Sequence, residues 1–353
     1  MTDFTAVIVL VSSTTAFAKV KFGKRQVEVE SYNTVFYGSR PTPENLAASM
    51  DTLGLGTRNV AIVDMDASFS YKPTDINPKD VKSMQERYES QYEMGDNQKT
   101  VLQVVKTAAG QKVFSGVAGR DMISEFSSLR DFGYNVIFYS GIVPIMCWKD
   151  ISKTDGLVVL GDSTRIVLYS SKAIKEFKFS ADFSTILSDT AGAIGCSTEH
   201  LLEAVTSVGC WNTPDNSEDI TDKGLDAEVY FKAIEEYLVA PFEELGALIE
   251  KVRAQKQSAS LELCGPASDV VGLSRKLSST PFTISDKVGL DTSVNERVEQ
   301  SGSVLAIQKA AAAIRDGLMN FCYSEPVDDK EPETPTQIEI EEDWVEEDAD
   351  EVT

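Results

Sequence analysis

The sequence is poor in the residues that commonly bind metals or form disulfides. It has one histidine and five cysteines in 353 residues. The cysteines are odd in number and irregularly spaced, and each lies in or beside an apolar stretch, so neither a disulfide framework nor a metal site is indicated. They are Cys147, Cys196, Cys210, Cys264 and Cys322. Reduced thiols of a cytoplasmic protein fit this pattern best, and His200, on a helical pattern, is expected to have a plain surface role.

Basic residues are also scarce. The chain has 33 Lys and Arg against 56 Asp and Glu, a formal net charge of -23, and no local basic patch is evident. Such a surface repels a polyanion. The composition therefore argues against nucleic acid as a partner.

Long hydrophobic runs are missing as well. No window approaches the roughly 18 uncharged apolar residues that a membrane span requires. The first apolar run is short, strand-like and without a basic region before it, so a secretory signal is not expected. We therefore expect a protein that does not insert into a membrane directly, although it could act at one through a partner.

The first part of the chain has clear strand and helix signals. Residues 4–12, 15–22 and 26–37 predict a three-strand meander from their alternation and their Val, Phe and Tyr content. A helix is expected from Thr42, whose hydroxyl can cap it, with Pro43 in the first helical position. Another apolar strand follows at 59–64.

The next section predicts a small α+β module over residues 58–141. Its expected elements are strands at 60–63, 69–72, 100–107 and 135–139, and helices at 77–92 and 119–132. Two helices on one small sheet is the economical way to pack such a segment.

The second half repeats the pattern of the first. Residues 156–169 read as an apolar strand, a turn of small hydroxylated residues and a second apolar strand, as residues 7–20 do, and 173–179 predicts a third strand. Helices at 183–194, 198–208 and 225–255 are expected to follow. A strand at 260–263 then leads through Gly265 into a helix to about 277, with a short strand at 283–284 and an Ala-rich helix at 294–318.

This duplication resembles the actin-like superfamily, and within it the type IV pilus assembly family of PilM and its relative FtsA. The family's first hairpin, Asp-x-Gly-Ser-Ser-x-x-Lys, is matched by Leu10-Val11-Ser12-Ser13-Thr14. Its second hairpin, Val-Asp-x-Gly-x-x-x-Thr, is matched by Val158-Val159-Leu160-Gly161-Asp162-Ser163-Thr164. The adenosine motif, with two glycines, is matched by Leu263-Cys264-Gly265-Pro266. The inserted module favours PilM among these relatives.

The resemblance implies an α/β, bilobal actin-like fold, a duplicated ribonuclease H-like fold with a small α+β insertion. The expected division is lobe I from 1–57, the inserted domain at 58–141, the second phosphate-type hairpin at 142–182, lobe II at 183–320 and a tail at 321–353. From Glu325 to Thr353 there are 14 acidic residues and one Lys, with three prolines, so this tail is expected to be disordered. Its isolated apolar residues, such as Trp344, could anchor a partner, but a solvating role is the simpler interpretation.

The residues that differ from the family pattern bear on catalysis. In actin-like proteins an acidic residue from each hairpin organises Mg²⁺ and the attacking water, and here Leu10 and Val159 stand in those places. We expect hydrolysis to be very slow or absent, so the chain is not assigned as an enzyme. Asp162 is a weak catalytic candidate, because a turn Asp can simply accept hydrogen bonds from nearby amides.

No cofactor or metal ligand is assigned with certainty, and ATP and Mg²⁺ stay open but doubtful. A retained nucleotide site would use the residues that match the family motifs: Ser12, Ser13, Thr14, Gly161, Asp162, Ser163, Thr164 and Gly265. Pro266 has no amide to donate, which weakens adenine binding. Lys19 and Arg165 follow the two turns and could neutralise phosphate, although solvated strand ends are the simpler interpretation.

The resemblance implies a cytoplasmic scaffold, peripheral to the inner membrane, in a type IV pilus or related secretion machine. Its expected partner is the cytoplasmic segment of a PilN-like membrane protein, with coupling to the pilus assembly machinery and self-association. Two alternatives stay open: an active actin-like ATPase or small-molecule kinase that uses Asp162, and a filament-forming FtsA-like or type II secretion protein. The acidic C-terminus disfavours an FtsA-like membrane helix, since anionic lipids would repel it.

Overall fold

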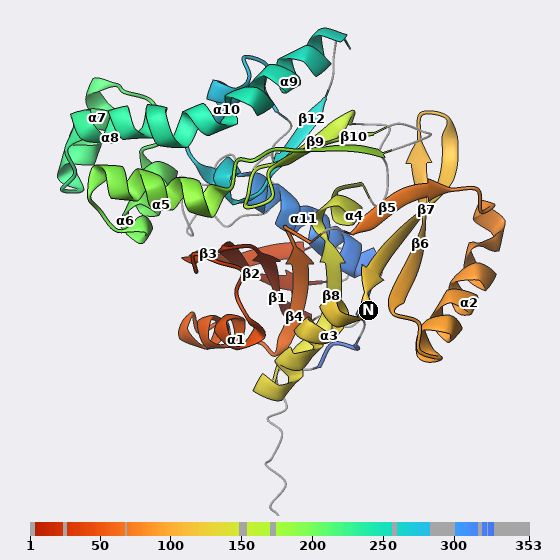
Figure 1. The fold of residues 1–353 in the computed structure, drawn as a ribbon. Helices are drawn as coiled ribbons and strands as arrows, with labels where there is room; N and C mark the ends of the chain where they lie inside the picture. Colours follow the sequence, from red (N-terminus) through yellow and green to blue (C-terminus); the bar gives the residue numbers. More distant parts are fainter. Residues whose placement is uncertain are drawn as a thin grey trace, which may run out of the picture.

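The computed structural model describes residues 4–23, 27–67, 69–147, 154–169, 174–255, 260–282, 301–316, 320–322 and 324–327. Two lobes are each built on their own β-sheet, and helix α11 (Gly302–Asp316) lies between them (Figure 1). A small third sheet stands beside them. We call residues 4–67 with 120–147 lobe I, residues 70–119 the small module, and residues 154–282 lobe II.

Lobe I has a five-stranded sheet in the order β3-β2-β1-β4-β8. Its strands are β1 (Phe4–Val11), β2 (Thr14–Phe22), β3 (Val27–Phe36), β4 (Asn59–Asp64) and β8 (Asn135–Gly141). The first three form the expected antiparallel meander, and β4 and β8 add in parallel. The apolar residues of β1 and β4 are buried on both faces, as in parallel sheets covered on both sides.

Short helices cover this sheet. They are α1 (Pro43–Thr52), α3 (Arg120–Ser127), the 3-10 helix η2 (Ser128–Phe132) and α4 (Ile142–Cys147). As expected, Thr42 caps α1 and Pro43 begins it, and the side chain of Asn45 completes a capping box with Thr42.

The small module is narrower than the sequence predicted. It contains strands β5 (Ser70–Thr74), β6 (Gln98–Thr107) and β7 (Gly110–Gly119) in the order β5-β7-β6, with η1 (Pro78–Asp80) and α2 (Val81–Glu93), and α2 packs on β6. The expected module of 58–141 is wrong at both ends, because β4 and β8 pair in the lobe I sheet. The hairpin strand β7 was missed, since its three glycines and Lys112 mask the alternation.

Lobe II repeats the topology of lobe I. Its sheet has the order β11-β10-β9-β12, with strands β9 (Gly156–Val159), β10 (Arg165–Tyr169), β11 (Ile174–Lys178) and β12 (Leu261–Cys264). β9, β10 and β11 form an antiparallel meander, and β12 pairs parallel to β9 as β4 does to β1. The duplication predicted from the two hairpins is thus present in the sheets.

The outer face of lobe II is helical. Its elements are α5 (Phe183–Ile194), α6 (Thr198–Ser207), α7 (Pro214–Asp222), α8 (Ala227–Ala233), the π-helix η3 (Ile234–Val239), η4 (Ala240–Phe242), α9 (Glu243–Gln255), η5 (Pro266–Asp269) and α10 (Leu273–Leu277). The expected single helix of 225–255 is interrupted. Pro241 has no N–H and its ring clashes with the carbonyl four residues earlier, so a regular α-helix cannot run through it.

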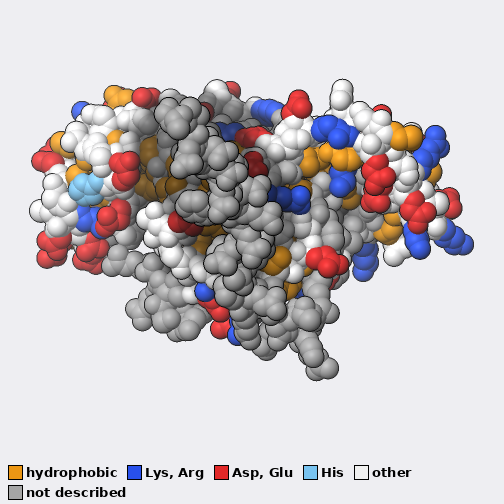
Figure 2. All heavy atoms as spheres, turned by 90° about the horizontal axis from the view of Figure 1, so that it is seen from below, with side chains coloured by type: hydrophobic (Ala, Val, Ile, Leu, Met, Phe, Trp, Pro, Cys, Tyr) orange, Lys and Arg blue, Asp and Glu red, His pale blue; other side chains and the backbone are white. Residues whose placement is uncertain are grey.

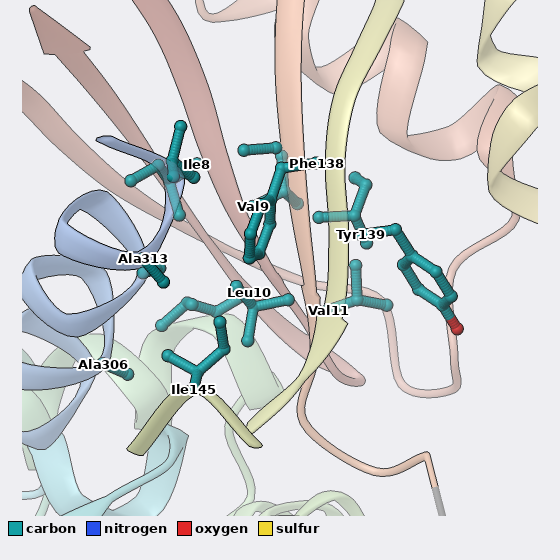
Figure 3. Close-up of a cluster of buried hydrophobic side chains, with 14 of the residues drawn as sticks. Ile8, Val9, Leu10, Val11, Phe138, Tyr139, Ile145, Ala306 and Ala313 are labelled. Atoms are coloured by element: carbon teal, nitrogen blue, oxygen red, sulfur yellow. The ribbon is translucent and has the colours of Figure 1, made fainter. Parts of the chain in front are cut away.

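Helix α11 joins the cores of the two lobes. It contacts β1 and β2 on one side and β12 and η5 on the other. Figure 3 shows Ala306 and Ala313 of this helix beside Ile8 and Leu10 of β1 and Ile145 of α4. Small alanines allow this close approach. Of the expected helix 294–318, residues 294–300 and 317–318 lie outside the described residues, as does the strand expected at 283–284.

The predicted start of the tail at residue 321 is wrong. Phe321 and Cys322 are buried, and the Phe321 amide donates to the Tyr139 carbonyl at 2.9 Å. The Asn59 side chain accepts a hydrogen bond from the Val327 amide, and the Asn135 side chain donates one to the Glu325 carbonyl. Residues 320–322 and 324–327 therefore pack on lobe I, and the acidic segment 328–353 lies outside the described residues.

Candidate interlobe site

The β1–β2 and β9–β10 turns use the same local hydrogen bonds. In the first, the Thr15 hydroxyl donates to the Ser12 carbonyl at 2.5 Å and accepts from the Ser12 amide at 3.3 Å. In the second, the Thr164 hydroxyl donates to the Gly161 carbonyl at 2.9 Å and accepts from the Gly161 amide at 3.4 Å. A hydroxyl three residues on thus closes each turn, so Thr164 is a turn residue here and its hydroxyl is occupied within its own hairpin.

The two turns are bonded to each other through Asp162. Its Oδ2 accepts from the Ser12 hydroxyl at 3.0 Å and the Ser13 amide at 2.9 Å. Its Oδ1 accepts from the Ser13 hydroxyl at 2.8 Å and the Ser184 amide, in the first turn of α5, at 3.1 Å. The Asp162 carboxylate therefore occupies the hydroxyl and amide donors of Ser12 and Ser13, which the resemblance predicted as phosphate-binding groups.

A second carboxylate links the lobes in the opposite direction. Asp66, just beyond β4, accepts from the Ser163 amide of lobe II at 3.2 Å through its Oδ1. Burial, with the nearby charges of Asp162 and Asp64, raises the pKa of Asp66 to about 7. The junction thus contains two acidic groups from opposite lobes, one of which titrates near neutral pH.

The loop that carries Asp66 is held by Asp64. The fully buried Asp64 carboxylate accepts hydrogen bonds from Nη1 and Nη2 of Arg40, at 3.0 and 2.7 Å. It also accepts from the backbone amides of Asp66 and Ala67. Bidentate pairing of this kind fixes both partners in one geometry. It positions the 64–67 loop against lobe II.

Arg165 lies inside the junction and is only 2% exposed. Its guanidinium donates to the Met65 carbonyl of lobe I at 2.8 Å and to the Ser163 hydroxyl at 3.0 Å, and it pairs with Glu176 at 3.4 Å. The interpretation of Arg165 as a solvated strand end is therefore wrong. Lys19 is partly exposed and pairs with Glu30 on β3.

The two positions that carry acids in the resembled family are part of the hydrophobic core. Leu10 is 2% exposed and Val159 is fully buried, and both belong to one continuous apolar cluster with α11 (Figure 3 shows Leu10 against Ile145). Because side chains alternate along a strand, Val159 points toward α11 while Val158 and Leu160 pack against the lobe II helices. An acid at either position would be unpaired in an apolar environment.

A cavity of about 860 Å³ opens between the lobes beside the junction. It is lined by β3 side chains including Tyr32 and Phe36, by Glu199 and Glu203 of α6, and by Trp211. Tyr32 crosses the lobes by donating to Asp269 at 3.0 Å. Burial raises the pKa of Asp269, whose carboxylate also receives the Ser301 hydroxyl.

One of the predicted nucleotide residues, Thr14, lines this cavity, and another, Gly265, directly precedes its lining residue Pro266. Thr14 is buried, and its hydroxyl has no hydrogen-bond partner among the residues described. Gly265 has φ +101°, and a Cβ there would lie 2.3 Å from the Leu160 carbonyl oxygen. Its lack of a side chain is thus explained by close packing on the backbone of Leu160, directly after β9, without reference to a ligand.

The structure brings Ser12, Ser13, Asp162 and Ser163 together in one hydrogen-bonded junction, with Gly161 and Thr164 shaping the second turn. Arg40, Asp64, Asp66 and Ser184 also belong to this junction and were not predicted from the sequence, and the predicted role of Arg165 was wrong. A signal for Asp64 and Asp66 existed, since acids at the carboxyl end of a buried parallel strand lie where binding sites of such sheets form. Their partners are distant in the chain.

A magnesium triphosphate does not fit this arrangement. Its phosphates need the donors that Asp162 holds, and the 860 Å³ cavity is lined by more acids (Glu199, Glu203, Asp269) than bases (Lys223, Arg275), with the Lys223 ammonium paired to Glu203 at 2.8 Å. Among the described residues, no group of three or more His, Cys, Asp or Glu side chains is arranged to hold a metal ion. What this site can do is hold the two lobes in one relative position.

On the face seen in Figure 2, acidic side chains predominate over the helical end of lobe II, whereas basic and acidic side chains are mixed over the small module. Within the described part of the chain, none of the helices combines the length and apolarity needed to cross a membrane.

Comparison with known proteins defines the fold. The structure superposes on a solved PilM-PilN type IV pilus biogenesis complex with a TM-score of 0.56 at 15% identity, covering 88% of this chain and 98% of that one. A weaker likeness is to the cytoplasmic domain of EpsL, an inner-membrane component of the type II secretion system of Vibrio cholerae, with a TM-score of 0.31 at 14% identity, covering 50% of this chain and 71% of that one. Another is to the ethanolamine utilization protein EutJ of Carboxydothermus hydrogenoformans, with a TM-score of 0.41 at 10% identity, covering 79% of this chain and 82% of that one.

The chain therefore has the bilobal actin-like α/β fold that its duplicated hairpins predicted. Of the structures compared, the chain from the PilM-PilN complex shares this fold over 88% of the present chain. No family model matches the chain, and no curated protein matches it.

Proposed function

We propose that this protein is a cytoplasmic actin-like scaffold of a type IV pilus or related secretion assembly complex, and that it is a pseudo-ATPase. The likeness over almost the full length of a protein solved in a PilM-PilN complex supports the first part. The Asp162 carboxylate, seated on the Ser12 and Ser13 donors, supports the second.

The pseudo-ATPase role follows from competition for the same donors. A phosphate can reach the Ser13 amide only if Asp162 leaves, and Leu10 and Val159 supply no oxygen to a metal ion. Rigid lobes suit a scaffold, because a partner then binds a surface that needs no ordering.

The expected partner is the cytoplasmic segment of a PilN-like inner-membrane protein, which would keep the chain peripheral to that membrane. Fluorescence anisotropy with a synthetic peptide that carries the cytoplasmic segment of a PilN-like protein tests this partner. We expect saturable micromolar or tighter binding, and a scrambled peptide is the control. A segment that binds no better than its scrambled form would contradict the scaffold proposal.

The pseudo-ATPase part is tested separately by calorimetry with Mg·ATP. We expect no submicromolar binding and no turnover by the wild type. Asp162→Ala frees the donors and is expected to gain at most weak ATP binding. Tight wild-type binding with turnover abolished in Asp162→Ala would instead support the ATPase alternative.

A further inference from the structure

Phe69 is the residue directly before the small module, and its ring lies in a pocket of lobe I. The ring contacts Tyr139 of β8, with 5.6 Å between the ring centroids, and Phe321, with 5.2 Å. Gly141, at the end of β8, forms a third wall, because a Cβ at this position would clash with the Phe69 ring. We call Tyr139, Gly141 and Phe321 the Phe69 pocket. One of its three walls therefore comes from the C-terminal part of the chain.

Phe321 is held in this position by a strap, the name we give to residues 320–322 and 324–327. The Asn320 side chain accepts from the Tyr139 amide at 3.0 Å and donates to the Ile137 carbonyl at 2.9 Å. The Phe321 amide donates to the Tyr139 carbonyl at 2.9 Å. A neighbouring strand would make similar bonds along the outer edge of β8. The strap therefore closes this edge of the lobe I sheet and brings a fully buried aromatic ring against Phe69.

The two halves of the strap are held unequally. Phe321 and Cys322 are buried, whereas residues 324–327 are exposed or half-buried and are bonded by polar side chains of β4, η2 and β8. Segments with few buried apolar contacts and exposed hydrogen bonds open most easily. The strap is therefore expected to open from residue 327 inward, and the Phe69 pocket stays complete until Phe321 leaves.

The other chain connection between lobe I and the small module passes through Arg120. This residue follows β7 directly and begins α3. Its amide donates to the Asn97 carbonyl at 2.8 Å, and its guanidinium donates to the Asp96 carbonyl at 3.1 Å and lies 4.0 Å from the centroid of the Tyr92 ring. This connection therefore holds the segment after α2 in a fixed position. A module fixed at one connection can pivot there unless the second connection, at Phe69, also holds.

The small module also approaches lobe II through an edge strand. β5 contacts β11, the edge strand of the lobe II sheet. Within the described part of the chain, β5 pairs only with β7 and β11 only with β10. No ladder of backbone hydrogen bonds joins the two edges there, so this contact follows the orientation of the module and does not set it.

We propose that the strap is a clamp that sets the orientation of the small module by closing the Phe69 pocket. With Phe321 in place, the Phe69 ring is enclosed by two aromatic rings and the backbone of Gly141. When the strap withdraws, the pocket loses one wall, and the module pivots about Arg120 and changes how β5 meets β11. The clamp goes beyond the proposed scaffold role and needs neither a nucleotide nor a partner to operate.

Double electron–electron resonance on the full chain measures the orientation of the small module. Spin labels on encoded unnatural amino acids replace the exposed Glu44 of α1 and Glu86 of α2, so the native cysteines stay in place. We expect one narrow distance in the otherwise wild-type chain, because the clamp is closed. In Phe321→Ala the distance distribution should become about twice as wide, because the module is free to pivot.

Two further variants separate the clamp from a general loss of stability. Gly141→Ala leaves the strap unchanged but places a Cβ against the Phe69 ring, so it should widen the distribution as Phe321→Ala does. Phe242→Ala removes an equally buried ring from the core of lobe II and should keep the wild-type distance. A wild-type distribution in Phe321→Ala or Gly141→Ala, or equal widening in Phe242→Ala, would overturn the clamp.

Phe321→Leu keeps the test decisive if the alanine variant does not fold. Leucine retains much of the apolar volume beside β8 but lacks the ring that contacts Phe69. We expect a widening smaller than that of Gly141→Ala. A distribution identical to that of the wild type would refute the proposal.

Discussion

Asp162→Ala is expected to loosen the two lobes measurably. The change removes the acceptor of four hydrogen bonds, three of which come from Ser12 and Ser13 of the other lobe. Hydrogen bonds to charged groups contribute about 1.5–3 kcal/mol each, so four would give roughly 6–12 kcal/mol as an upper bound.

Two effects reduce this value. The site is partly exposed, so water can satisfy the freed serine donors, and removal of the Asp162 charge relieves its repulsion with Asp66. The raised Asp66 pKa corresponds to roughly 4 kcal/mol at about 1.4 kcal/mol per unit, of which only part comes from Asp162 because burial is the larger cause. We therefore expect a net destabilisation of about 3 kcal/mol at pH 7.

Urea and thermal unfolding followed by circular dichroism measure this loss, which corresponds to a fall in Tm of about 6–10 °C. Asp162→Asn keeps one acceptor oxygen and should lose about half as much. Asp189→Ala, an exposed Asp on α5, is the control and should lie within about 0.5 kcal/mol of wild type.

The pH dependence sharpens the comparison. The folded pKa of Asp66 is raised, so its contribution to stability is complete below about pH 4 and is lost as the pH rises to about 7. The gap between wild type and Asp162→Ala should therefore be wider at pH 5 than at pH 8, where repulsion offsets the hydrogen bonds. Stability of Asp162→Ala equal to wild type at both pH values would refute the role given to this carboxylate.

Two further predictions test the core and the backbone. Leu10 is buried among apolar groups, so Leu10→Ala should lower the free energy of unfolding, measured in urea, by about 2–5 kcal/mol. Leu10→Asp should unfold the chain without creating a magnesium site. A folded Leu10→Asp protein that binds Mg²⁺ in calorimetry would contradict this. Gly265→Ala should destabilise the fold by at least about 2 kcal/mol, because φ is +101° and the Leu160 carbonyl leaves no room for a Cβ. Gly192→Ala on α5, with open space around it, is the control and should stabilise the fold by about 0.5–1 kcal/mol. Equal effects of the two substitutions would show that Gly265 is not under backbone constraint.

Local patterns predicted much of the secondary structure. The two meanders, the Thr42 cap and the parallel strand after each meander depend on apolar alternation and turn residues within short windows. The small module was assigned too widely because β4 and β8 resemble strands of any sheet. β4 pairs with β1, about 50 residues earlier, and β8 pairs with β4, about 75 residues earlier, and no local pattern specifies either pairing.

The candidate site was predictable only in part. The turn residues Ser12, Ser13 and Asp162 could be found because small hydroxylated and acidic residues cluster between apolar strands. Their mutual contact could not, since Ser13 and Asp162 are 149 residues apart. The buried state of Arg165 was also hidden, because its burial depends on a backbone carbonyl of Met65 in the other lobe.

The amino-acid sequence by itself determined the duplicated hairpins, the apolar residues at positions 10 and 159, and the acidic charge balance, because each of these depends on residue type and short-range spacing. The tertiary structure decided that the two turns bond directly to each other, that Asp162 accepts from Ser12 and Asp66 from Ser163 across the lobes, and that β4 and β8 belong to lobe I. These features arise from contacts between distant segments, whose free energy depends on burial and geometry that only the packed lobes create.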